Sequence, residues 1–302
     1  METEDKMTDG IRRIWVIADA HIGKVSDGAD GADWFEMSLR DICAQDVPVD
    51  YGINLGDVTH GSAEEQFARY RHIRDSSSIR TWFEVCGNHD FAAMITGLRR
   101  RYIETPRYWT VTDGNMLFIS LPAERGNAAG MLVPEVEQWL RRQIAANSGR
   151  NIVVCAHQFP RVTVFRSAIS SRCLYPLDTV ERFARETHVD LWLGGHIHGT
   201  PRTVAATASR YGTVFMNAAS ISHVYNTGSC NSFLLEVREG AGCLKAFCRD
   251  HDRKTFLSDQ YVEVPLRYPA EPGSEPVLKG FDLDVPERYR NIEPEQVTAD
   301  MF

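Results

Sequence analysis

Short apolar runs alternate with amphipathic segments along most of the chain. Runs rich in Val, Ile, Leu and aromatic residues are typical of strands, and apolar residues three or four apart are typical of helices. The pattern predicts strands at residues 11–18, 53–55, 81–86, 151–156, 190–193, 213–217, 232–237 and 243–249, with a hairpin of 108–111 and 116–120. It predicts helices at residues 33–44, 63–75, 134–146 and 177–187. This alternation indicates an α/β fold.

The composition changes after residue 250. Six of the thirteen prolines lie in the segment that follows: Pro265, Pro269, Pro272, Pro276, Pro286 and Pro294. We expect a polar tail at 1–10, a globular catalytic domain at 11–250 and a proline-rich C-terminal arm at 251–302. The arm either packs along the body or reaches a partner subunit in a homo-oligomer, and a disordered tail is the alternative.

The charge balance narrows the classes of function. The chain carries 33 basic and 41 acidic side chains, a formal charge of -8. Nucleic acids and membrane surfaces are recognised through a basic field, so we expect neither as a partner. No apolar stretch reaches the length of a membrane span, and the first ten residues are too polar for a signal peptide. With seven scattered cysteines, these features predict a cytoplasmic protein with reduced thiols.

Side chains that can bind metals follow five of the predicted strands. They are Asp19 with His21, Asp57, Asn88 with His89 and Asp90, His157, and His196 with His198. Ligands gather at the carboxyl ends of strands in open α/β sheets, so these side chains are expected to meet. Imidazoles with carboxylate and amide oxygens suit Mn, Fe, Zn or Co. Seven potential ligands exceed the needs of one ion, which predicts two ions that share a bridging carboxylate.

Each block alone has an ordinary structural explanation. An isolated Gly-Asp or Asp-x-His is most often part of a turn or a helix cap. Five such blocks in order, each at the end of a predicted strand, favour a functional site instead. A chain of this length also needs no metal merely to fold.

The ordered pattern Asp-x-His, Gly-Asp, Gly-Asn-His-Asp, His and Gly-His-x-His resembles that of the calcineurin-like metallophosphoesterases, over about residues 11–250. Tyr108-Trp109 and residues 130–140 resemble the layout of its cyclic-nucleotide and glycerophosphodiester phosphodiesterase branch. The fourth block departs from that branch, because Gln158 stands where a second histidine is common. The resemblance implies an α/β fold of the four-layer α+β sandwich type, with two packed mixed β-sheets flanked by helices.

The resemblance also implies roles for the residues of the blocks. One metal ion would be held by Asp19, His21, Asp57 and His198. The other would be held by Asp57, Asn88, His157 and His196, with Asp57 as the bridge. His89 would be the catalytic histidine that faces the leaving group, and Asp90 would orient it.

The expected activity is hydrolysis of a phosphodiester in a small or nucleotide-like substrate. Two divalent or transition-metal ions would supply a bridging hydroxide, and His89 would act as general acid. A phosphomonoesterase and a DNA-repair nuclease of the same family are alternatives, and a non-catalytic metal-binding interaction module is the alternative from another class. Six side chains near the blocks are candidate substrate contacts: Lys24, His60, Arg125, Arg161, Arg166 and His223.

Overall fold

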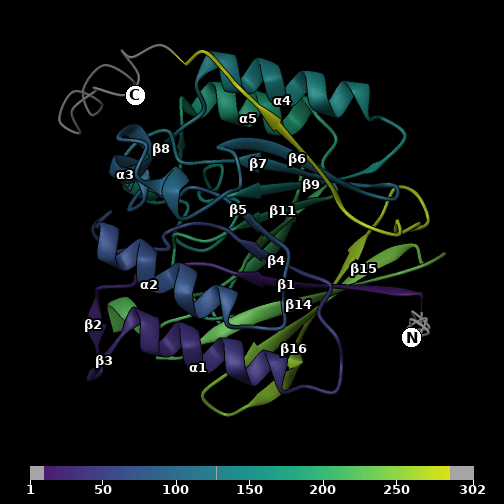
Figure 1. The fold of residues 1–302 in the computed structure, drawn as a ribbon. Coiled ribbons are helices and arrows are strands. Elements are labelled where there is room, and N and C mark those ends of the chain that lie inside the picture. The colour runs from purple at the N-terminus through teal and green to yellow at the C-terminus, as the bar shows by residue number, and fades with distance from the viewer. Residues whose placement is uncertain (1–9, 127, 227, 286–302) are drawn as a thin grey trace, which may run out of the picture.

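Two β-sheets packed face to face form the centre of the protein (Figure 1). The computed structural model describes residues 10–126, 128–226 and 228–285. Sheet one has the strand order β16 (Thr255–Pro265), β15 (Cys243–Asp250), β14 (Asn231–Arg238), β1 (Ile11–Ile17), β4 (Tyr51–Asn54) and β5 (Trp82–Glu84). Sheet two has the order β12 (Thr207–Arg210), β13 (Thr213–Asn217), β11 (Leu191–Gly194), β9 (Asn151–Ala156), β7 (Met116–Leu121), β6 (Tyr108–Asp113) and β17 (Val277–Phe281).

Helices cover the outer faces of both sheets. The α-helices are α1 (Gly31–Cys43), α2 (Glu64–Asp75), α3 (Phe91–Ile95), α4 (Pro134–Ala146) and α5 (Leu177–Glu186). Short 3-10 turns form η1 (Arg99–Arg101), η2 (Ser170–Arg172) and η3 (Val224–Asn226). Two small ladders pair β2 (Val25–Ser26) with β3 (Ala29–Asp30) and β8 (Gly130–Met131) with β10 (Leu174–Tyr175). None of the helices in the described ranges is long and apolar enough to cross a membrane.

Three apolar layers hold the sheets and helices together. Ile14 and Val16 of β1 face the layer between the two sheets, whereas Trp15 and Ile17 face the layer under α1 and α2. A third layer lies between sheet two and helices α4 and α5. Because both faces of these strands are buried, their sequences are continuously apolar rather than alternating. The expected fold of two packed mixed sheets flanked by helices is confirmed.

The segment after residue 250 belongs to both sheets. Strand β16 pairs antiparallel with β15, and β17 pairs antiparallel with β6. The boundary predicted at residue 250 therefore falls between two paired strands, and residues 255–265 and 277–281 pack along the body, which is the first of the two placements predicted for the arm. The strands within this segment were not predicted because Pro265, Pro269, Pro272 and Pro276 interrupt the pattern. These four prolines lie at the end of β16 and in the crossover to β17, where proline is tolerated. The rest of the predicted arm and residues 1–9 of the predicted tail lie outside the described residues.

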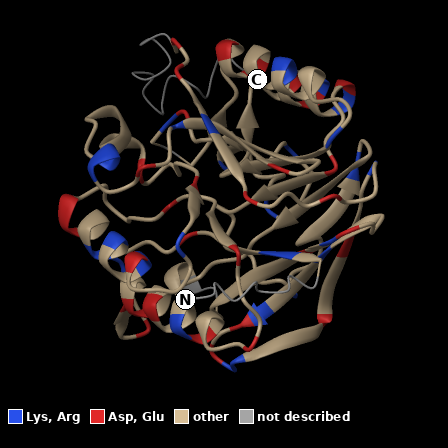
Figure 2. Cartoon of the chain, turned by 45° about the vertical axis from the view of Figure 1, so that its right-hand side comes forward, with Lys and Arg blue, Asp and Glu red and all other residues tan. Residues whose placement is uncertain are grey.

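A buried ionic network fastens α1 to sheet one. The guanidinium of Arg249 donates to both oxygens of Asp41 at 2.8 and 2.7 Å, and His251 Nδ1 contacts Asp41 at 2.7 Å. Burial alone would raise the pKa of Asp41, but the bonds from Arg249 and His251 hold it well below its usual value. Positions of Lys and Arg alternate with positions of Asp and Glu along the ribbon in Figure 2.

Candidate metal centre

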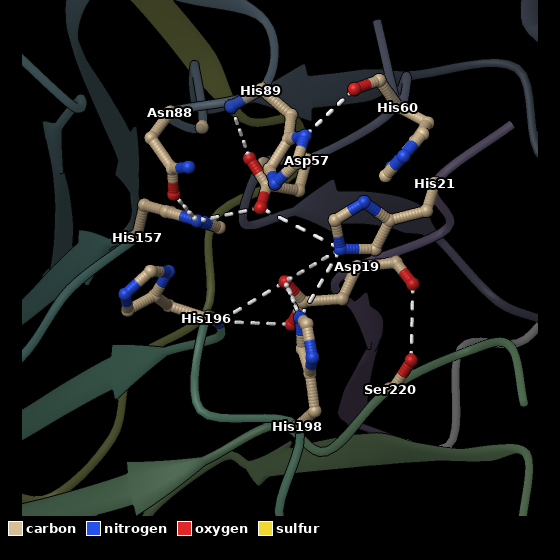
Figure 3. Close-up of polar contacts among 12 residues, drawn as sticks. Asp19, His21, Asp57, His60, Asn88, His89, His157, His196, His198 and Ser220 are labelled. Atoms are coloured by element: carbon tan, nitrogen blue, oxygen red, sulfur yellow. Dashed lines mark hydrogen bonds and ion pairs between the residues drawn. The ribbon is translucent and has the colours of Figure 1, made fainter. Parts of the chain in front are cut away.

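The strand direction brings the five blocks to one place. Strands β1, β4 and β5 run parallel in sheet one, and β7, β9, β11 and β13 run parallel in sheet two. The loops after β1, β4, β5, β9 and β11 carry the predicted ligands, and their side chains converge (Figure 3). The ligands thus come from the carboxyl ends of strands in both sheets.

The chain turns sharply at these strand ends. Five residues of the blocks have left-handed backbone conformations, with φ between 47° and 66°: Asp19, His21, Asp57, His196 and His198. Such a conformation costs a residue with a side chain about 1–3 kcal/mol, and it persists only where the surroundings enforce it. Backbone hydrogen bonds between loops do so here, from Asp19 N to the Gly56 carbonyl at 3.0 Å and from His21 N to the Asp57 carbonyl at 2.9 Å.

Two glycines allow the loops to approach this closely. A Cβ atom at Gly87 would lie 2.1 Å from the Asp57 backbone nitrogen, and one at Gly195 would lie 2.7 Å from Asp19 Oδ2. No other residue fits at these two positions without displacing a ligand. The Gly of Gly-Asn-His-Asp and the second Gly of Gly-Gly-His are therefore part of the site geometry.

The first ligand group comprises Asp19, His21, Asp57 and His198, all buried and with ligand atoms within 4.8 Å of one another. The Nε2 atoms of His21 and His198 lie 3.1 Å apart, and His198 Nε2 lies 3.1 Å from Asp19 Oδ1. Burial lowers the pKa of His21 well below its usual value, so its imidazole is neutral. Neutral imidazoles and carboxylates in this arrangement fit a divalent ion.

The second ligand group comprises Asp57, His157 and His196. The Nδ1 atom of His157 donates to the Leu55 carbonyl at 2.8 Å, which directs Nε2 to Asp57 Oδ2 at 3.2 Å and Asn88 Oδ1 at 3.1 Å. Burial would lower the pKa of His157, but the Asp57 carboxylate raises it to about 9. His196 Nε2 is buried and has no hydrogen-bond partner in the described part of the chain, as expected of an atom that binds a metal ion. Asp57 belongs to both groups and is placed to bridge two ions.

His89 lies at the edge of these groups. Its Nδ1 atom is 2.7 Å from the carbonyl oxygen of His60, which can only accept, so Nδ1 carries a proton and Nε2 is left available. Its ring centroid is 4.7 Å from that of His21. His60 stacks on it with centroids 5.0 Å apart, and burial lowers the pKa of His60.

Asp90 has a different role from the one expected. Its two oxygens accept hydrogen bonds from the amides of Val58, Thr59 and Gly87 and from the Thr59 hydroxyl, at 2.9 to 3.1 Å. Asp90 therefore ties the loop after β4 to the loop after β5. The expectation that Asp90 orients His89 is wrong, because the His60 carbonyl holds the His89 ring and the Asp90 oxygens are committed to other donors.

The six candidate substrate contacts separate into two sets. Lys24, His60 and Arg166 lie at the centre: Lys24 Nζ is 5.8 Å from the Tyr225 ring, and Arg166 contacts the Ile197 carbonyl in the Gly-His-x-His loop. The other three have surroundings of their own. Burial raises the pKa values of Cys173 and Tyr175, and the nearby charge of Arg161 offsets a small part of this rise. His223 pairs with Asp27 and Asp252. Arg125 is 3% exposed, and its guanidinium nitrogens have no hydrogen-bond partner within residues 10–126, 128–226 and 228–285.

Sequence reasoning missed Tyr225 and Arg172. The Tyr225 ring stacks on His198 with centroids 4.9 Å apart, lies 5.4 Å from His21, and is 47% exposed. Its backbone has φ 56°, which is rare for an aromatic residue and gives no signal in a sequence. Arg172 donates to the His196 carbonyl at 3.3 Å.

The loop after β13 supports the first block. The hydroxyls of Ser220 and Ser222 both donate to the Asp19 carbonyl, at 3.0 and 2.8 Å. The sequence could have indicated these two serines, because they are polar residues that follow the carboxyl end of the strand predicted at 213–217.

Comparisons with known proteins agree with this architecture. A purple acid phosphatase, PPD1, from yellow lupin (Lupinus luteus) seeds has a TM-score of 0.55 at 10% identity, over 83% of this chain and 53% of that one. The chain thus spans about half the length of the lupin enzyme. Sulfate thiohydrolase SoxB from Thermus thermophilus gives a TM-score of 0.44 at 10% identity, covering 86% and 56%. Vps29 from Chaetomium thermophilum gives 0.39 at 13%, covering 89% and 98%.

Of these three structures, the lupin phosphatase alone exceeds a TM-score of 0.5, and at 10% identity it shows a shared fold and no more. A search of curated protein sequences found no match. The family model of the calcineurin-like phosphoesterases matches residues 12–200, which include every residue of the five blocks. This match covers more than half of the chain, and the protein therefore belongs to the calcineurin-like phosphoesterase family.

Proposed function

We propose that the protein hydrolyses phosphodiesters in a small or nucleotide-like substrate, with a dinuclear metal centre. The observation that carries the proposal is the sharing of Asp57 between two buried ligand groups, next to a histidine with one ring nitrogen available. Two bound ions would lower the pKa of a water molecule and neutralise phosphate oxygens. Family membership supports a metal-dependent phosphoester hydrolase, and the preference for diesters is the finer part of the proposal.

The chain's own residues have distinct roles in this proposal. The cations of Lys24 and Arg172 approach the centre from different loops and would attract an anionic phosphate. His89 keeps Nδ1–H on the His60 carbonyl, so a second proton at Nε2 can pass to the departing alkoxide. After transfer the ring is neutral and still oriented by the same bond.

The surroundings of the centre favour a diester over a monoester. A diester carries a substituent beyond the leaving group, and that substituent needs a surface beside the metals. The exposed ring of Tyr225, with Lys24 near it, supplies an aromatic and cationic surface at that place. Such a surface suits a nucleoside or another group with a planar ring.

A substrate panel tests the proposal. Chelated protein reloaded with Mn²⁺ would be assayed on bis(p-nitrophenyl) phosphate, p-nitrophenyl phosphate, cyclic nucleotides and single-stranded DNA. We expect the highest kcat/KM on a small diester, loss of activity in Asp57→Asn, and full activity in the control His72→Ala on the exposed side of α2. A higher kcat/KM on the monoester would identify a phosphomonoesterase. No turnover of any ester would refute the proposal.

A further inference from the structure

A second cluster of metal-binding side chains lies outside the centre at the strand ends. His223 precedes η3, Cys230 precedes β14, and Asp252 follows β15, so three separate segments contribute one residue each. Their ligand atoms lie within 4.8 Å of one another. Neither the five blocks nor the family match uses any of the three, because the match ends at residue 200.

The imidazole of His223 is held in one orientation. It stacks on Trp34 with ring centroids 4.3 Å apart and an angle of 25° between the planes. Its Nδ1 atom lies 3.3 Å from Asp27, and its Nε2 atom lies 2.9 Å from Asp252. Histidines that ligate a metal through one nitrogen almost always donate the other N–H to a carboxylate or carbonyl, and Asp27 is placed as that acceptor.

The carboxylate of Asp252 is also held in place. The backbone amide of Cys230 donates to Asp252 Oδ2 at 2.9 Å, and His223 Nε2 lies 2.9 Å from Oδ1 and 3.0 Å from Oδ2. Cys230 is fully buried, and burial raises the pKa of its thiol. Asp252 also lines a cavity of about 270 Å³ with Ser229 and Arg253, which gives an ion a route from solvent.

We propose that His223, Cys230 and Asp252 form a second metal site, which takes Zn²⁺ with a water molecule as fourth ligand. One nitrogen, one thiolate and one carboxylate with an open position form a donor set that zinc accepts in tetrahedral geometry. Zinc binding requires a thiolate at Cys230 and an Nε2 of His223 without a proton, and protons displaced from these atoms pass to the solvent, while Nδ1–H stays on Asp27.

The position of the site gives it a structural consequence. Tyr225 lies between His223 and Cys230 in the sequence, and its ring stacks on the metal-centre residue His198. An ion bound by His223 and Cys230 ties both ends of the segment that carries Tyr225. The Ser26 hydroxyl, which donates to the His223 carbonyl at 3.0 Å, fixes the same segment from β2. The second site would thus help to fix the position of Tyr225 in the proposed substrate surface. The metal site itself goes beyond the proposed function and does not depend on it.

Cobalt substitution tests the site directly, because the centre at the strand ends contains no thiolate. Chelated full-length protein would be loaded with Co²⁺, and the thiolate-to-cobalt charge-transfer absorption in the near ultraviolet would be measured with the number of ions per chain. We expect the absorption in the wild type and three ions per chain. It should disappear in Cys230→Ser, with loss of one ion, and persist in the control Cys43→Ser.

Further variants separate this site from the catalytic centre. Asp57→Asn should lose the ions of the centre and keep the thiolate absorption. Asp27→Asn should keep the absorption but bind Co²⁺ about 10–100-fold more weakly. If His223 and Asp252 form only an ion pair, the wild type will bind two ions without thiolate absorption, and the proposal is overturned. Absorption that survives in both Cys230→Ser and His223→Gln would overturn it as well.

Discussion

Replacing Asp90 with Asn should destabilise the protein and weaken its metal binding together. In the wild type Oδ1 accepts from the amide and hydroxyl of Thr59, and Oδ2 accepts from the amides of Val58 and Gly87. An Asn side chain keeps one acceptor and turns the other into an NH2 donor. At least one of the two metal-carrying loops therefore loses its anchor.

The magnitude follows from the four hydrogen bonds. With the amide oxygen toward Val58 and Gly87, the NH2 group faces Thr59, whose hydroxyl can rotate to accept but whose N–H cannot. One buried unsatisfied N–H costs about 1–3 kcal/mol, and the bonds that remain lose their charged acceptor, which costs about 1 kcal/mol more. Burial and the charge of Asp57 raise the pKa of Asp90, so removal of the Asp90 charge offsets part of the lost stability. A net loss of about 2–3 kcal/mol in the free energy of unfolding results.

Urea unfolding of metal-loaded and chelated protein measures this loss, and elemental analysis measures the metals. Thr59→Val removes the hydroxyl, which donates to Asp90 and accepts from the Ser62 amide at 3.2 Å, but keeps the backbone bond to Asp90. It is the matched control, with an expected loss of about 1 kcal/mol. If Asp90 instead oriented the His89 ring, Asp90→Asn would keep its stability and its metals and would lose activity on alkyl esters. That result would refute the assignment of Asp90 to the loops.

Three further substitutions test other parts of the molecule. His89→Ala should keep its metals, lose about 10²–10⁴-fold in rate on alkyl diesters and lose much less on nitrophenyl esters; equal losses would contradict a general acid. Asp57→Asn should lower the occupancy of both metal positions in elemental analysis, and one intact position would contradict a bridge. Asp41→Asn leaves Arg249 unpaired and should cost about 3–5 kcal/mol. The pKa of Asp41 is depressed by Arg249 and His251, so this contribution is fully present above the pKa of an unfolded Asp, ~3.9, and is lost progressively as the pH falls from there through the much lower pKa of the folded carboxyl. The difference in urea midpoint between the two proteins should therefore be constant from pH 7 to about 5 and should narrow as the pH falls from about 4 to 3, and a difference that stays constant down to pH 3 would contradict the network.

The ligand positions could be predicted because each follows an apolar run. A buried strand identifies its own end, and parallel strands bring their ends together, so Asp19 and His198 can be expected to meet although they are far apart in sequence. The role of Asp90 could not be predicted, because its partners are backbone amides, which every residue has. Strand β17 was missed because Pro269 and Pro276 lie near it, and a sequence does not show that they stand in a crossover between two edge strands.

Tyr225 illustrates a different limit of the sequence. Its contact with His198 depends on a left-handed backbone at one residue of an irregular loop. The periodicity of apolar residues does not indicate such a conformation, and Tyr is not a residue type that favours it. The residues that shape the surface around the metals were therefore less accessible to sequence reasoning than the metal ligands.

The pairing of β1 with β14 determines when the protein can assemble during synthesis. The first ligand block directly follows strand β1, but β14 begins only at residue 231, and the serines that support Asp19 are residues 220 and 222. At ribosomal rates of about 5–20 residues per second, some 200 residues take about 10–40 s to emerge. Throughout that interval the apolar β1 lacks one neighbour and attracts chaperones or other chains. The metal centre can therefore form only late in synthesis. A truncated chain that lacks β14 should not bind the metals, even though it contains every ligand residue.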